Sequence, residues 1–173
     1  DKNLRKNILL RIGDTFIAEG NLIAARNHFK VQHRKNDNTS VSPFTMKEIH
    51  LIFLTGTIDT AKTVLDSVIV NALPNDIYFN DLMELQDIIS QNYTFGSETD
   101  KEALVQYSIA ERLLQQYKLV EAAEMLAFIR ENYPDVSILP IVMLRECLLR
   151  LLLEDVSISL NISQLLQETQ FAP

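Results

Sequence analysis

The sequence has few of the residues that a disulfide-bonded or strand-rich protein needs. Its 173 residues include one cysteine, no tryptophan, four glycines and five prolines. A single cysteine excludes an internal disulfide framework and any zinc site built from several cysteines. Few glycines and prolines leave few points where a helix must break, and the abundance of Leu, Ile, Ala, Glu and Gln favours helices. The composition therefore predicts an all-α protein.

A long uncharged apolar run is also missing. The most apolar stretch, 138–153, is interrupted by Pro140, Arg145, Glu146 and Arg150. Charged side chains in such a segment oppose burial in hydrocarbon, so we expect no membrane insertion. The chain begins with an aspartate rather than a methionine, which indicates a processed product or a segment of a longer chain with its targeting information upstream.

Sequence patterns that carry chemistry are absent as well. There is no glycine-rich phosphate loop, HExxH, GxSxG or Cys-x-x-Cys pattern, so we expect no enzyme activity and no cofactor. His28 and His33 are five residues apart, too far around a helix to share a metal, and Cys147 is expected to pack as a small apolar side chain. The only basic cluster lies at 28–35 in a chain of net charge −7, which argues against nucleic-acid binding.

Charge is unevenly distributed along the chain. Residues 1–50 contain nine Lys/Arg against five Asp/Glu, whereas residues 51–173 contain seven against eighteen. A basic first part on an acidic body can steer a partner of opposite polarity. An ordinary solvated surface with a chance asymmetry explains the counts equally well.

The most informative stretch is 9–37, which reads as two amphipathic helices joined by a tight turn at Gly20-Asn21. Gly13 stands in the middle of the first helix, where glycine costs about 1 kcal/mol relative to alanine. Close packing of a partner helix explains that cost, and Ala24 and Ala25 are the small residues that such a partner would bring. The apolar faces of the two helices consist of Leu9, Ile12, Gly13, Phe16, Ala25 and Phe29.

The same order of residues returns along the chain. A turn glycine and a small alanine recur after 36 residues, at Gly56 and Ala61. After a further 61 residues Tyr117 stands at the turn, followed by Ala122, and in a last pair Glu154-Asp155 replaces the turn glycine and Ser159 the alanine. The longer interval accommodates one extra helix.

This order resembles the tetratricopeptide repeat, a helix–turn–helix unit of 34 residues. The resemblance implies an antiparallel helix-hairpin solenoid of about nine helices, wound as a right-handed superhelix, that binds other proteins. The segments FLTGTIDTAKTVLDSV, NDIYFNDLMELQDIISQN and ERLLQQYKLVEAAEMLAFIRENYPD also resemble the C-terminal part of long bacterial tetratricopeptide proteins. Within a single domain of residues 1–173, we expect repeat one at 1–37, repeat two at 42–74, an extra helix and loop at 75–98, repeat three at 99–134 and a terminal helix pair at 137–173.

Helix boundaries are predicted from capping residues. Ser42 or Thr45 is expected to begin the third helix, and Thr99 with Glu102 reads as a capping box for a later one. The extra helix is expected to run from Asn75 or Asp76 to Asn92. Its predicted buried stripe is Ile77, Leu82, Leu85, Ile88 and Ile89, and that of the last helix is Ile158, Ile162, Leu165 and Leu166.

In this repeat architecture the first helix of each pair lines the concave face. The predicted partner-binding residues are Leu10, Asp14, Ile17, Met46, His50, Phe53, Tyr107, Glu111 and Leu114. An apolar groove with a few polar groups suits an apolar or amphipathic segment of a protein or peptide partner. Because only Lys47 is basic at the matching positions of repeats one and two, the resemblance does not extend to repeats that clamp a C-terminal carboxylate.

We therefore predict a scaffold or adaptor segment of a larger bacterial protein or assembly. The alternative is a structural subunit that is permanently buried in a multiprotein complex. The sequence leaves a cytoplasmic or periplasmic location open.

Overall fold

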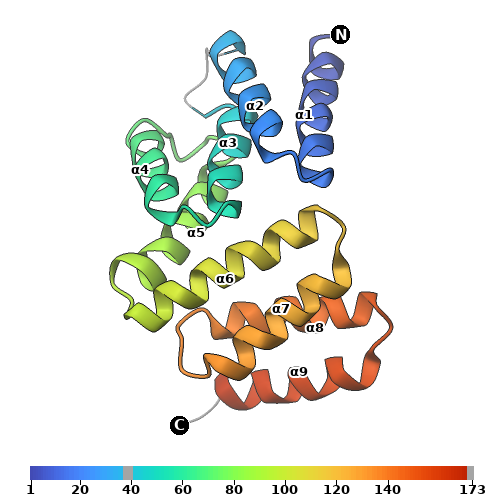
Figure 1. The fold of residues 1–173 in the computed structure, drawn as a ribbon. Coiled ribbons are helices and arrows are strands. Elements are labelled where there is room, and N and C mark those ends of the chain that lie inside the picture. Colours follow the sequence, from blue (N-terminus) through green and yellow to red (C-terminus); the bar gives the residue numbers. More distant parts are fainter. Residues whose placement is uncertain (37–40, 171–173) are drawn as a thin grey trace. The chain divides into compact units, whose positions relative to one another are not determined.

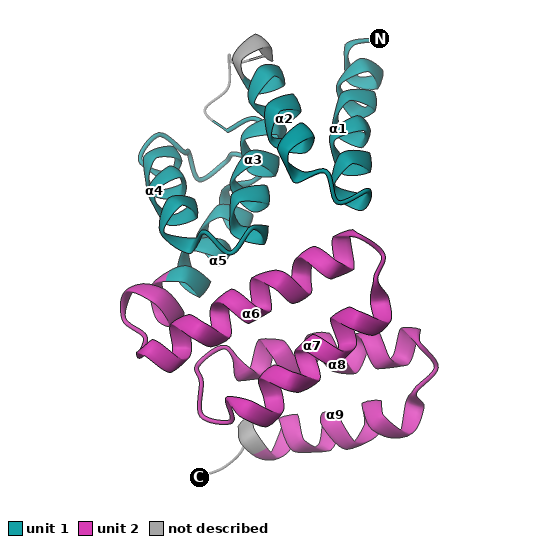
Figure 2. Ribbon diagram, viewed as in Figure 1, with its two compact units in different colours: residues 1–89 teal, residues 90–173 magenta. Residues whose placement is uncertain are grey.

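The computed structural model describes residues 1–36 and 41–170 (Figure 1). Within these residues the chain forms nine α-helices, one short π-helix and no strand, which confirms the predicted all-α class. The chain divides into two compact units, residues 1–89 and residues 90–173 (Figure 2). The division falls inside the segment 75–98, which the sequence set apart as an extra helix and loop.

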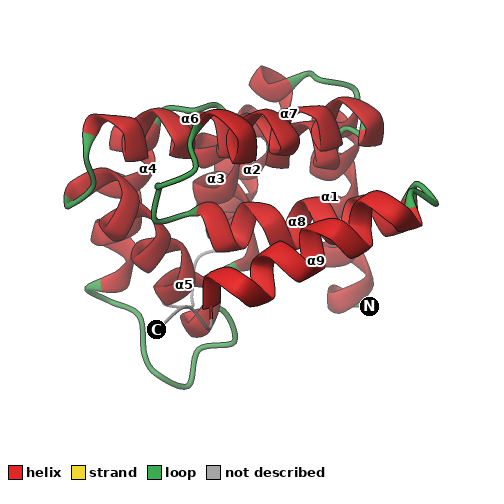
Figure 3. Ribbon diagram, turned by 90° about the horizontal axis from the view of Figure 1, so that it is seen from below, coloured by secondary structure: helices red, strands yellow, loops and turns green. Residues whose placement is uncertain are grey.

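Consecutive helices pack against one another within each unit. Unit 1 contains α1 (Lys2–Ala18), α2 (Leu22–Asn36), α3 (Pro43–Leu54), α4 (Ile58–Ile69) and α5 (Phe79–Ile89). Unit 2 contains the π-helix η1 (Ser90–Thr94), α6 (Glu98–Gln115), α7 (Leu119–Asn132), α8 (Leu139–Leu152) and α9 (Val156–Gln170). Figure 3 shows the helical elements and the loops that connect them.

Four helix pairs turn in the same way. In each turn one residue adopts a left-handed backbone, with φ of 79° at Gly20, 77° at Gly56, 58° at Tyr117 and 64° at Glu154. The N–H of that residue donates to the carbonyl three positions earlier, over 2.9 to 3.1 Å, which closes the preceding helix. The predicted turns at Gly20, Gly56, Tyr117 and Glu154-Asp155 are thus confirmed.

A small buried residue follows each of these turns by five positions. Ala25, Ala61 and Ala122 are completely buried, and Ser159 exposes 2% of its surface. A larger side chain at these places would hold the two helices of the pair apart. The recurrence that the sequence showed is therefore a recurrence of helix crossings.

The turn residue Tyr117 offers a test of this equivalence. Its side chain is 79% exposed, so little packing is lost when it is removed. A left-handed backbone costs a non-glycine residue about 1–2 kcal/mol. Glycine avoids this strain but loses more conformational entropy on folding, so the net gain is smaller. We expect Tyr117→Gly to raise the free energy of unfolding by about 0.5–1 kcal/mol in urea titrations. The neighbouring Gln116→Gly, at φ −90°, should give no gain. A lower free energy of unfolding in both variants would contradict the equivalence of Tyr117 with the turn glycines.

Gly13 permits a close approach of α1 and α2. The residue is buried, and a Cβ atom at this position would overlap the ring of Phe29 from α2. Phe29 is itself fully buried in a cluster with Ile17, Ala25, Phe44 and Leu51. The predicted reason for a glycine in mid-helix, close packing of a partner helix, is confirmed.

Two predicted helix starts need correction. α3 begins after Ser42, whose hydroxyl accepts the Thr45 N–H at 3.1 Å, as expected. The capping box of α6 is formed by Ser97 and Asp100 and not by Thr99 and Glu102, because Ser97 is the last residue with an extended backbone. α5 starts at Phe79, since the carboxylate of Asp76 accepts the Leu73 N–H at 2.8 Å within a preceding turn.

The predicted buried stripes are correct only in part. Ile77 precedes α5 and is 89% exposed, whereas Leu82 and Ile89 are buried as expected. On α9 Ile162 is buried, but Ile158 and Leu165 are 40% and 45% exposed. An end helix has a neighbour on one side only, so its apolar stripe is covered along a narrower strip. α2 ends at Asn36, and residues 37–40 lie outside the described part of the chain.

Candidate interaction surface

The predicted partner-binding residues occupy three registers, which lie ten, six and three residues before each turn. The structure buries Ile17, Phe53, Tyr107 and Glu111. It leaves the others half-buried: Leu10, Asp14, Met46, His50 and Leu114. The buried members belong to the packing of the helices, and the half-buried members retain some surface for a partner.

Two of the predicted carboxylates join first helices of successive pairs. Asp14 on α1 lies 2.7 Å from the Lys47 ammonium on α3, and Glu111 on α6 lies 3.1 Å from the Arg145 guanidinium on α8. Both carboxylates stand six residues before a turn, and both cations stand nine residues before the next. The pair of Asp14 and Lys47 is partly exposed, so it contributes about 0–1 kcal/mol. The Glu111 carboxylate is only 10% exposed, so its pairing with Arg145 offsets the cost of burying its charge.

Tyr107 lies beside the second pair. Burial raises the pKa of its hydroxyl, and the nearby carboxylate of Glu111 raises this pKa further. The phenol therefore stays neutral across the physiological range and acts as a packed polar group.

The fourth helix pair carries an apolar surface at the same three registers. Leu144, Leu148 and Leu151 on α8 expose 50%, 53% and 48% of their surfaces. Their spacing of four and three residues places them on one face of the helix. We call these three residues the leucine stripe. The sequence prediction did not include them, although the turn at Glu154 gives their register in the same way as the turns of the first three repeats.

A second face of α8 is held by a buried charge network. Glu146 is fully buried, and its Oε2 atom accepts from Nε of Arg130 on α7 at 2.8 Å. Its Oε1 atom lies 3.8 Å from Nε of Arg150, which also reaches Asp155 at 3.3 Å before α9. The hydrogen bond that Arg130 donates to the Glu146 carboxylate is the largest cause of the raised pKa of Arg130. This network ties α8 to α7 and to the final turn.

Asp100 anchors the start of α6 to the segment before α8. Its carboxylate accepts the Ser137 N–H at 2.9 Å. It also accepts the Ser97 N–H at 2.9 Å, as part of the capping box, and the Ser97 hydroxyl at 2.7 Å. These hydrogen bonds, with that from Ser137 the largest cause, lower the pKa of Asp100. Each of them favours the charged carboxylate.

The lowered pKa predicts an acid-dependent contribution to stability. Because the folded pKa lies below the unfolded value of about 3.9, the contribution is present above that pH and disappears as pH falls through the folded pKa. We expect Asp100→Asn to reduce the free energy of unfolding by about 1–2 kcal/mol at pH 7. The difference from the wild type should shrink below about pH 4 in urea titrations. Asp135→Asn, which removes an exposed carboxylate, is the control; a pH-independent deficit in Asp100→Asn would contradict the prediction.

His28 and Cys147, which the sequence singled out as possible metal ligands or nucleophiles, take part in local packing. His28 Nε2 lies 2.7 Å from the carbonyl of Leu9, and its ring meets that of Phe29 edge-on. Cys147 on α8 is half-buried, with its sulfur 3.1 Å from the hydroxyl of Ser159 on α9. Within the described ranges no group of three His, Cys, Asp or Glu residues could hold a metal, and no helix has the length and apolarity for a membrane crossing.

The fold defines an all-helical protein of consecutively packed helices in which one form of hairpin recurs. Comparison with protein-family models, with curated proteins and with solved structures gives no match. The resemblance to tetratricopeptide repeats therefore stays a prediction.

Proposed function

We propose that the chain is a protein–protein interaction scaffold or adaptor of the tetratricopeptide kind, part of a larger bacterial protein or assembly. The observation that carries this proposal is the leucine stripe. Contiguous exposed apolar side chains on a folded surface mark sites of association more often than scattered ones do. The stripe also stands at the registers where this architecture presents its binding face.

The exposed area is large enough to matter for affinity. Each leucine of the stripe has about half of its surface in water, and covering that half contributes roughly 1 kcal/mol. Three such contributions correspond to about a hundred-fold in affinity. An amphipathic segment with apolar residues at helical spacing matches the stripe, because its side chains fall at the same intervals. The half-buried Leu114 is the further contact that we propose within unit 2, and Met46 and His50 are proposed as separate contacts of unit 1.

The competing proposal is a structural subunit whose outer faces are permanently covered. Exposed apolar residues on α9 favour it, since Val156, Leu160 and Leu165 expose 52%, 59% and 45% of their surfaces. A permanent subunit should self-associate when isolated, whereas an adaptor should stay monomeric. Sedimentation of the isolated chain at micromolar concentration separates the two.

The scaffold proposal predicts that a charge in the stripe abolishes partner binding. We expect Leu148→Asp to lose proteins that the wild-type chain captures, because a carboxylate must be desolvated at the interface. Leu4→Asp is the control, since Leu4 is 60% exposed on α1, outside the stripe. Quantitative mass spectrometry of captured proteins is the measurement, with melting curves to show that both variants fold. Equal capture by all three proteins would refute a role for the stripe.

A further inference from the structure

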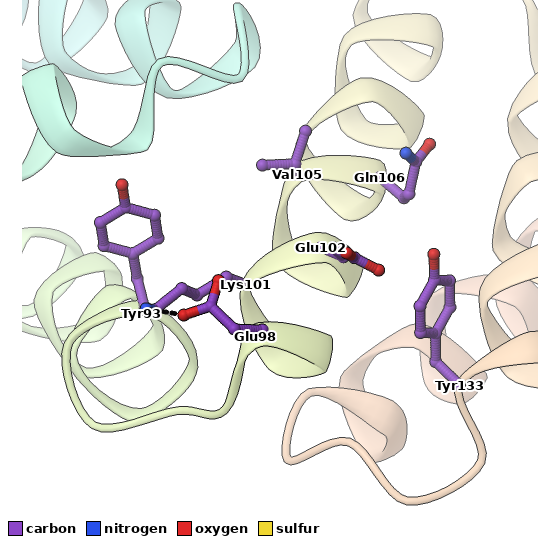
Figure 4. A pocket seen from close by; sticks show the side chains of 7 residues that line it. All are labelled: Tyr93, Glu98, Lys101, Glu102, Val105, Gln106 and Tyr133. Carbon is purple, nitrogen blue, oxygen red and sulfur yellow. Dashed lines mark hydrogen bonds and ion pairs between the residues drawn. The ribbon is translucent and has the colours of Figure 1, made fainter.

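A shallow groove lies beside α6 in unit 2 (Figure 4). It has a volume of about 540 Å³ and is bounded by Tyr93 from η1 and by Tyr133, which follows α7. The residues of α6 between these two tyrosines are charged or polar, apart from Val105. Aromatic rings together with carboxylates are the groups that recognise cations in proteins.

One side of the groove already holds a cation of the chain itself. The Lys101 ammonium lies 5.9 Å from the centroid of the Tyr93 ring and 2.6 Å from Glu98. Lys101 therefore already occupies both the carboxylate of Glu98 and the ring face of Tyr93. This side shows which kind of group the groove accommodates.

The opposite side also has a carboxylate, Glu102, and an aromatic ring, Tyr133, but no cation of the described chain lies between them. Glu102 and Gln106 stand one helical turn apart on α6, and Figure 4 shows the carboxylate of Glu102 directed toward the side on which Tyr133 lies. Glu102 is exposed, and within the described residues its carboxylate forms no ion pair. The Tyr133 ring is held edge-on by Phe128, with centroids 6.1 Å apart. The carboxylate of Glu102 and the ring of Tyr133 thus line the same side of the groove, whereas the amide of Gln106 points away from both in Figure 4.

We infer that this side of the groove binds an arginine side chain of a protein partner. The guanidinium stacks on the Tyr133 ring and donates to the carboxylate of Glu102. The inference names the chemistry of one partner segment and so rests on the proposed function. It concerns a surface that is separate from the leucine stripe.

Arginine fits these groups better than lysine does. Its guanidinium is planar, so one face can stack on a ring while the edge presents several N–H donors in fixed directions. An ammonium is a point charge that would satisfy the carboxylate and leave the flat contact with the ring unused.

The surrounding charge also favours a cation. Residues 90–173 contain twelve Asp/Glu against six Lys/Arg. The positive end of the α6 dipole opposes a cation only within the first turn, where the carboxylate of Asp100 already caps the helix. Glu102 stands beyond that turn, and the charged residues that line the groove, Glu98, Lys101 and Glu102, sum to a net charge of −1, which favours a cation.

The test is an NMR titration of the full chain with acetyl-Gly-Arg-Gly-amide. We expect saturable shifts of the amides of Glu102, Gln106 and Tyr133, and an affinity that falls as salt is added. The citrulline peptide, which has the same shape and no charge, should bind at least about three-fold more weakly. Glu102→Gln should weaken binding of the arginine peptide about three- to ten-fold, whereas Glu121→Gln, an equal charge change on α7, should leave it unchanged.

Equal binding of the arginine and citrulline peptides would overturn the inference, as would equal weakening by Glu102→Gln and Glu121→Gln. Tighter binding of free arginine than of the blocked peptide would assign the groove to the amino acid instead of a protein segment. Leu148→Asp should leave this titration unchanged. If the titration fails while Leu148→Asp still abolishes partner capture, the groove inference falls and the proposed function stands.

Discussion

Replacing Glu146 with alanine should lower the free energy of unfolding by about 3 kcal/mol, one of the two largest effects that we expect. Glu146 is fully buried between Arg130 and Arg150, whose side chains are only 22% and 16% exposed. Loss of one member of a buried ion pair costs about 3–5 kcal/mol, because the partner is left charged without compensation. Arginine cannot escape this cost by losing its proton.

The lower end of that range applies because each arginine has a second carboxylate. Arg130 lies 3.2 Å from Glu131, and Arg150 lies 3.3 Å from Asp155. Glu131 and Asp155 are 63% and 44% exposed, so solvent screens the replacement pairs and they compensate only in part.

Urea-induced unfolding followed by circular dichroism is the measurement for Glu146→Ala. Glu131→Ala is a matched control, since it removes an exposed carboxylate from the same arginine and should change stability by less than about 1 kcal/mol. Amide hydrogen exchange should show that the loss of protection is concentrated in α7, α8 and α9. Equal effects of the two substitutions would show that burial of Glu146 does not determine the stability of this unit.

Replacing Phe29 with alanine should reduce the free energy of unfolding by about 3–5 kcal/mol, the usual range for a buried phenylalanine. Phe29 is completely buried in the core cluster of unit 1 and packs directly over Gly13. On the same helix Ile23 is 78% exposed, so Ile23→Ala should cost less than about 0.5 kcal/mol. Chemical unfolding of the two variants measures the difference.

The same contact predicts that Gly13→Ala destabilises the wild-type protein but stabilises the Phe29→Ala variant. In the wild type, alanine gains about 1 kcal/mol of helix propensity but overlaps the Phe29 ring, and overpacking costs about 1–3 kcal/mol. We expect a net loss. With Phe29→Ala the ring is gone, so Gly13→Ala should then stabilise by about 1 kcal/mol. A double-mutant cycle measures this coupling, and additive effects would show that the close approach does not restrict residue 13.

The features that sequence predicted best are those fixed by the local backbone. A left-handed turn residue followed by a small residue at a helix crossing leaves a signature in two positions, and this identified all four hairpins. Even Tyr117 and Glu154, which are not glycines, were placed correctly because Ala122 and Ser159 follow at the same interval. Helix starts are harder to predict from sequence, since several capping residues such as Ser97 and Thr99 compete within a few positions.

The candidate surface was harder to predict because it depends on which faces remain uncovered. Arg145, Glu146 and Arg150 read in the sequence only as charges that interrupt an apolar stretch. In the structure Glu146 is buried between Arg130 and Arg150, and Arg145 pairs with Glu111. Leu149 is buried, whereas the leucine stripe faces water. A helix that is apolar on most sides gives no indication in its own sequence of which side its neighbours cover.

The sequence by itself thus determined the helical class, the four hairpin turns and the small residues at their crossings, because each of these is a requirement on the chain within a few residues. Only the tertiary structure decided which charges pair, that Glu146 is buried, and that the leucine stripe and the Tyr133 side of the groove stay open. Those outcomes depend on contacts between helices that are distant in sequence, and burial of any one side chain is settled by all the elements packed around it.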